Sequence, residues 1–148
     1  MAKFLTPLIN EDIDARYSRI YEPFIFESDT LKKAGYDPRV EVPLGFVHDY
    51  ESVPIIKGTS KHGGVGHDYL CRADSVPCVT KKIAADVYFE IMESRAAEKI
   101  PRKQYFARFN SWWRRWLKWG VVLVAVGYFH KHKVMATYEE MSGGENAA

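Results

Sequence analysis

Cysteine and long hydrophobic runs are both scarce in this chain. Two cysteines, Cys71 and Cys78, cannot crosslink 148 residues, so a disulfide scaffold is excluded. Six residues separate them, which matches no zinc ribbon, and no second cysteine pair completes one. The longest apolar run, Gly120 to Phe129, extends about 15 Å as a helix, half of what a bilayer requires. We therefore expect reduced, structural thiols.

The chain also begins without a continuous apolar segment, and its first residues turn acidic at Glu11. This pattern predicts no secretory signal peptide and indicates folding in the cytoplasm. A hydrophobic content of 47% with 14% aromatic residues excludes disorder throughout and suffices for one core.

Acidic residues are nearly missing from one region. Between Arg95 and Lys133 there are ten Lys or Arg residues and a single acid, Glu98. The rest of the chain carries more acidic than basic residues. The net charge of +2 is therefore the sum of an acidic N-terminal part, a basic, Trp-rich region over 95–133 and an acidic C-terminal tail.

The pattern of residues predicts an α+β fold. Residues 21–27 and 39–47 are typical of strands, and 28–38 of a loop with one helical turn. The glycines of 48–66 predict a long irregular loop, followed by a short helix from His67 to about Ala73. Thr80 and Pro101 bound a predicted helix over 81–99. The expected order is thus a small N-terminal β-hairpin or sheet, a Gly-rich loop, packed helices and a basic Trp-rich segment.

Three parts follow from this order: a small α+β domain over 1–108, a basic Trp-rich helical segment over 109–133, and an acidic, flexible tail over 134–148. The region from Trp112 to Phe129 has three interpretations. It is a buried helix or strand, an interfacial or short anchoring helix that docks on a membrane surface or a protein, or a nucleic-acid face. The nucleic-acid signal is weak, because stacking platforms usually spread over several strands.

Reactive side chains gather in three short blocks, around Asp49 and Ser52, at His67 and Asp68, and at Asp86. His67 and Asp68 are adjacent on a helix and point about 100° apart, so each needs another partner. His67 could act as a general base whose tautomer Asp86 fixes, while Asp49 and Asp68 hold a divalent cation. Ser52 is the one hydroxyl near these groups and is a further candidate catalytic residue, although it lacks the strand-turn-helix elbow of hydrolase nucleophiles. The same residues could instead form a buried structural network of helix caps and turns.

The three blocks resemble the phage and prophage proteins of the domain of unknown function 1353 family. The residues concerned read VPLGFVHDYESVP (42–54), HDYLC (67–71) and ADVYF (85–89), with His48 and Cys71 where the family usually has Thr and Tyr. The resemblance covers about residues 20–100. It implies a phage or prophage origin, hence a host cytoplasm, and a small α+β domain with these residues around one place.

Two functional hypotheses remain open. The first is a small metal-assisted hydrolase with a His-Asp site, acting on envelope or lipid ester or amide bonds at an anionic membrane. The second is a non-enzymatic phage accessory or virion-associated protein, whose Trp-rich segment docks a membrane or a phage or host protein.

Overall fold

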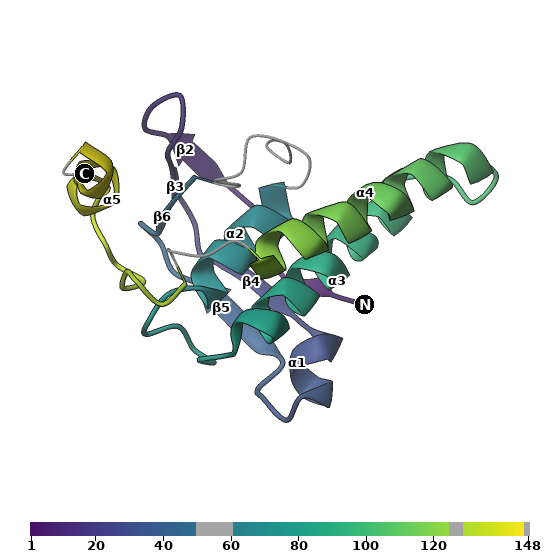
Figure 1. Ribbon diagram of the computed structural model, residues 1–148, viewed down its shortest axis with the longest axis horizontal. Helices are drawn as coiled ribbons and strands as arrows, with labels where there is room; N and C mark the ends of the chain where they lie inside the picture. The colour runs from purple at the N-terminus through teal and green to yellow at the C-terminus, as the bar shows by residue number, and fades with distance from the viewer. Residues whose placement is uncertain (50–60, 125–128, 147–148) are drawn as a thin grey trace.

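A computed structural model describes residues 1–49, 61–124 and 129–146 (Figure 1). Within them, two three-stranded antiparallel sheets precede most of the helical part of the chain. The predicted α+β class, with an N-terminal sheet and C-terminal helices, is confirmed.

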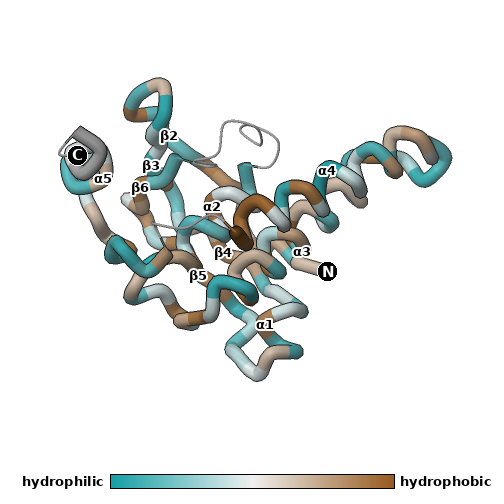
Figure 2. Tube along the Cα trace, viewed as in Figure 1, coloured by the Kyte–Doolittle hydropathy of each residue, from teal (hydrophilic) through white to brown (hydrophobic). Residues whose placement is uncertain are grey.

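The first sheet has the order β1 (Lys3–Phe4), β4 (Phe24–Glu27), β5 (Arg39–Val42). Phe24 pairs with Val42 and Phe26 with Val40, and all four side chains are fully buried. Alternate residues of a strand face the same side, so this register gives the sheet one continuous apolar face. Figure 2 colours the chain by hydropathy, and β4 and β5 contain both hydrophobic and hydrophilic residues, as two-sided strands require.

The second sheet has the order β2 (Asn10–Asp12), β3 (Ser18–Ile20), β6 (Val47–His48). Its pairing of Ser18 with His48 fixes the direction of the chain just before Asp49. The sheet therefore positions one of the predicted site residues.

A short helix, α1 (Asp29–Lys33), follows β4 within the predicted loop. Ser28 caps it, and the carboxylate of Glu90 accepts hydrogen bonds from the Ser28 hydroxyl (2.5 Å) and from the amide of Asp29 (2.8 Å). Glu90 lies about 60 residues further along the chain, on another helix, and its buried carboxylate satisfies free N–H groups at the start of α1.

The predicted irregular stretch is wrong at its C-terminal end, because α2 (Lys61–Leu70) already begins at Lys61 and includes three glycines. Packing explains the difference. A Cβ on Gly66 would lie 2.8 Å from Ile91 Cδ1 and 3.3 Å from Phe26 Cζ. A glycine at this point lets α2 approach both the sheet and the next helix, and that contact offsets the poor helix propensity.

The predicted helix over 81–99 is confirmed as α3 (Lys81–Lys99). The Thr80 hydroxyl accepts a hydrogen bond from the amide of Ile83, and the helix ends before Pro101. Val87 and Ile91 pack with α2 and the first sheet in the main core.

The Trp-rich region forms one continuous helix, α4 (Tyr105–Val124), that packs antiparallel along α3. Val122 joins Ala85, Tyr88 and Met92 in a second small core. The α3–α4 hairpin extends away from the sheets, with its turn at the far end (Figure 1). In the part of the chain that the structure describes, no helix has the length and apolar character to cross a membrane.

A last helix, α5 (Tyr138–Asn146), occupies the tail that was predicted to be flexible. The Tyr138 hydroxyl donates to Asp14 (2.6 Å), and its ring packs edge-on against Tyr17. These contacts hold α5 against the turn between β2 and β3.

Candidate functional site

The structure brings together three of the predicted site residues. His67 and Asp68 lie in the last turn of α2, and Asp49 directly follows β6; all three side chains are buried. Asp86 lies on α3, and Ser52 lies outside the described residues. The predicted neighbourhood of Asp49 and Asp68 can therefore be described, whereas the role of Ser52 stays a prediction.

Asp49 and Asp68 form a pair of carboxyl groups, each only 8% exposed. Burial, followed by the negative charge of Asp49, raises the pKa of Asp68 well above its usual value. A side-chain hydrogen bond to Asp49 favours the protonated form further. These effects favour a proton on Asp68 at the contact with Asp49, whose carboxylate also lies 3.6 Å from Arg16.

Arg72 completes this cluster, although no sequence block predicted it. Arg72 follows Asp68 by four residues, just after the end of α2, so the two side chains lie on the same side of this turn. Its Nη2 donates to the carbonyl of Val47 (2.9 Å), and its guanidinium lies over the Phe46 ring. Burial lowers the pKa of Arg72, while Asp68 and Asp49 oppose that shift.

His67 lies beside Cys71, a second residue for which the sequence predicted no role at the site. The Cys71 Sγ lies 3.5 Å from His67 Nε2, as expected for positions four apart on a helix. Burial, and then the charge of Lys81, lowers the pKa of His67 to about 4. Burial also raises the pKa of the Cys71 thiol. Both groups are neutral at pH 7, so the pair is not a thiolate nucleophile with its imidazolium.

Asp86 has partners of its own on the α3–α4 interface. One carboxylate oxygen accepts from Lys82 Nζ (2.6 Å), and the other accepts from Trp119 Nε1 (2.8 Å). The contact with Trp119 ties α4 to α3, whereas Lys82 lies on α3 itself. Its predicted role as the residue that orients His67 gains no support from them and stays a prediction.

The predicted cation site would use the carboxylates of Asp49 and Asp68. Among the described residues, no group of three His, Cys, Asp or Glu side chains is placed to hold a metal ion. The cation site at Asp49 and Asp68 therefore stays a prediction.

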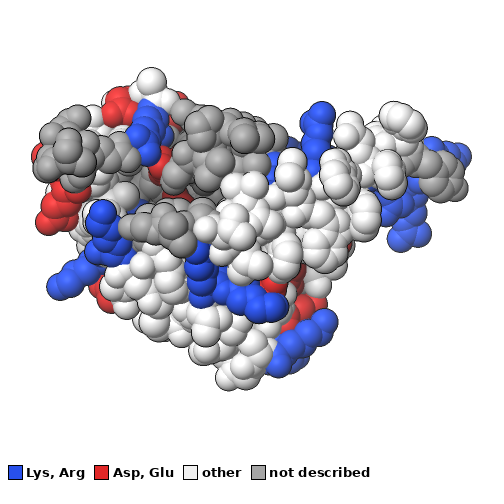
Figure 3. Space-filling model, in the orientation of Figure 1, with Lys and Arg blue, Asp and Glu red and all other residues white. Residues whose placement is uncertain are grey.

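A separate feature is the outer side of α4, which exposes large apolar side chains. We call them the aromatic face: Phe106, Phe109, Trp112, Trp113, Trp116 and Leu117. Exposed fractions range from 42% at Trp116 to 88% at Phe106. Figure 3 shows a broad uncharged surface over α4 with Lys and Arg side chains at its margins.

Comparison with known proteins does not place this geometry in a family, because no family model, no curated protein and no solved structure matches the chain. The resemblance to the domain of unknown function 1353 family therefore stays a prediction.

Proposed function

We propose that the protein binds peripherally to an anionic membrane surface through the aromatic face of α4. The observation that carries this proposal is the exposure of six large apolar side chains on one side of one helix. Monomeric soluble proteins rarely expose a contiguous apolar patch of this kind unless it binds something.

The geometry of α4 suits a helix that lies flat on a lipid surface. At 100° per residue, the aromatic face covers an arc of about 140°, and it extends about 17 Å along the helix axis. When the helix lies flat, all side chains within this arc reach the level of the lipid headgroups, where tryptophan is favoured.

Charge favours anionic lipid as the partner. α4 contains four Arg or Lys residues and no acid, and Arg102 and Lys103 precede it. Arg102, Lys103 and Arg108 are exposed. A cation near an anionic bilayer contributes about 1 kcal/mol, in addition to the apolar side chains that insert.

Vesicle flotation tests this proposal. The full chain is expected to float with phosphatidylglycerol vesicles and much less with phosphatidylcholine vesicles, and added salt should weaken the association. Phe106→Gln with Trp113→Gln removes two inserted rings, each worth about 2 kcal/mol, so the partition should fall more than tenfold. The matched control is Leu44→Gln with Val76→Gln, which removes two exposed apolar side chains away from α4. Undiminished flotation of the α4 variant, or no flotation of the wild type, refutes the proposal.

A second candidate function is a small hydrolase of ester or amide bonds, and the Asp49–Asp68 pair favours it. A carboxyl group whose pKa is raised lies beside a second carboxyl group, an arrangement that can supply an acid and a base in one place. Neutral His67 lies beside them as a further base. In this scheme Asp68 protonates the leaving group and Asp49 activates water.

A screen with chromogenic esters and anilides over pH 4–9 tests the second candidate. Asp49→Asn and Asp68→Asn should each lower kcat by about 100-fold or more with an unchanged fold. Arg16→Gln, which removes the ion pair between Arg16 and Asp49 and leaves both carboxyl groups in place, serves as the control. Activity that survives both Asn variants assigns the pair to a structural network, as in the accessory-protein hypothesis.

A further inference from the structure

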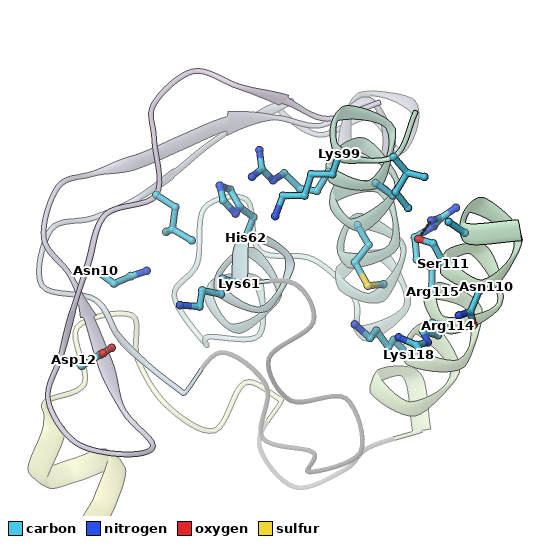
Figure 4. A pocket seen from close by; sticks show the side chains of 16 residues that line it. Asn10, Asp12, Lys61, His62, Lys99, Asn110, Ser111, Arg114, Arg115 and Lys118 are labelled. Carbon is cyan, nitrogen blue, oxygen red and sulfur yellow. Dashed lines mark hydrogen bonds between the residues drawn. The ribbon is translucent and has the colours of Figure 1, made fainter. Parts of the chain in front are cut away.

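A cavity of about 780 Å³ lies between the helices, away from the carboxyl pair. Its walls are β2, the start of α2, the C-terminal half of α3 and one side of α4 (Figure 4). Its volume lies in the range of small-molecule sites, which are roughly 300–1,000 Å³.

Positive charge dominates this cavity, which we call the basic cleft. Six cations from three helices line it: Lys61, Arg95, Lys99, Arg114, Arg115 and Lys118. Asp12 is the single acidic side chain among the described lining residues. Figure 4 shows cations of α2, α3 and α4 around one hollow, so their potentials add within it.

Several of these positive groups are removed from water. Lys118 is only 6% exposed, although lysine is rarely buried. The Nε of Arg115 is buried with no hydrogen-bond partner among the described residues, while its Nη1 donates to Ser111. Burial, and then the charges of Arg95 and Lys99, lowers the pKa of His62 on the cleft wall to about 4. An anion in the cleft would relieve this accumulation of positive charge.

The position of the cleft on α4 separates it from the aromatic face. Arg114 and Lys118 each follow a tryptophan of that face by two residues, which is about 200° around the helix. A bilayer against the aromatic face therefore lies on the other side of α4 from the cleft. The ligand must be a soluble anion.

The remaining lining residues narrow the class of this anion. Asn10, Asn110 and Ser111 offer hydrogen bonds, and Leu8, Met92 and Ile100 form an apolar part of the wall. Cations recognise phosphate chains by charge and by charge-assisted hydrogen bonds. We infer that the basic cleft binds a soluble phosphate chain, either inorganic or carried by a nucleoside.

Isothermal titration of the full chain with tripolyphosphate and with ATP, both without metal, tests this inference. At least one is expected to bind with a 1:1 stoichiometry and to raise Tm in proportion to its concentration. Tighter binding of ATP assigns a nucleoside to the apolar wall, whereas equal binding assigns the phosphate chain alone.

Charge reversal locates the site. Lys99→Glu and Arg114→Glu change exposed cleft residues and should each weaken binding by about tenfold or more. Lys33→Glu makes the same charge change at the far end of α1 and should leave the affinity nearly unchanged. Lys99→Gln and Arg114→Gln provide milder versions, should circular dichroism show that a reversal disturbs the fold.

Three outcomes would overturn the inference. They are no binding of either phosphate compound at millimolar concentration, an equal loss in the Lys33→Glu control, and binding of a single-stranded oligonucleotide alone, which would make the cleft part of a nucleic-acid surface.

Discussion

Replacing Asp68 by asparagine is expected to make the protein more stable relative to the wild type as the pH rises. In the native state Asp68 holds its proton beside Asp49, because burial and the neighbouring charge raise its pKa. In the unfolded chain the same carboxyl group ionises near pH 4. Above that pH the unfolded state therefore binds fewer protons than the native state, and the free energy of unfolding of the wild type falls.

The magnitude follows from linkage. Between the unfolded and the native pKa of Asp68, the wild type loses about 1.4 kcal/mol of stability for each pH unit. The asparagine of the Asp68→Asn variant has no proton to lose, and its amide can donate to Asp49 as the protonated carboxyl does. The difference between variant and wild type thus grows with pH in that window, and it stops growing above the native pKa.

Urea unfolding at half-unit steps from pH 4 to pH 8 measures this difference directly. Subtraction of the two curves removes the titration of the groups that lie away from Asp68 and titrate identically in both proteins. Glu22→Gln, an exposed carboxylate removed elsewhere, controls for the change in net charge. A difference that stays constant across the range, or that shrinks as the pH rises, would show that Asp68 is ionised in the folded protein and refute the reasoning.

Three further changes test the packing around the site. Glu90→Ala removes the carboxylate that caps α1 from α3 and should cost about 2–3 kcal/mol in urea unfolding; a loss below about 0.5 kcal/mol would contradict the buried network. Gly66→Ala should cost about 1 kcal/mol or more because its Cβ meets Ile91 Cδ1, and Ile91→Val should reduce that cost in a double-mutant cycle; additive effects would argue against the contact. A thiol reagent at pH 8 should modify exposed Cys78 and leave buried Cys71, whose pKa is raised by burial, unmodified until the protein unfolds; two fast equivalents in the native protein would disprove the burial.

Local signals in the sequence predict α3 and much of the first sheet. Thr80 supplies a cap and Pro101 a stop, so both ends of α3 can be read without knowledge of the fold. In β5 the alternation of charged and apolar residues specifies which side is buried.

The start of α2 could not be predicted in the same way. Glycine normally ends a helix, and the reason for Gly66 lies in Ile91 and Phe26, which approach it from other elements. A rule based on neighbours along the chain cannot include contacts that exist only after folding.

The candidate site shows the same division. Adjacent blocks predicted that Asp49 and Asp68 meet, and they do. The partner of Asp86 was not predictable, because Trp119 reaches it only when α4 folds back onto α3. Arg72 and Cys71 could have been found by a search four residues beyond Asp68 and His67, where side chains share a helix side.

All four tryptophans of the chain lie on α4, at positions 112, 113, 116 and 119. Intrinsic tryptophan fluorescence therefore reports on this one helix, and the two sheets contribute no indole signal. A fluorescence melt of the protein follows the detachment of α4 from α3, whereas far-ultraviolet circular dichroism follows the whole fold. If the two curves separate, the hairpin opens before the sheets unfold, and the protein carries its own optical probe of that opening.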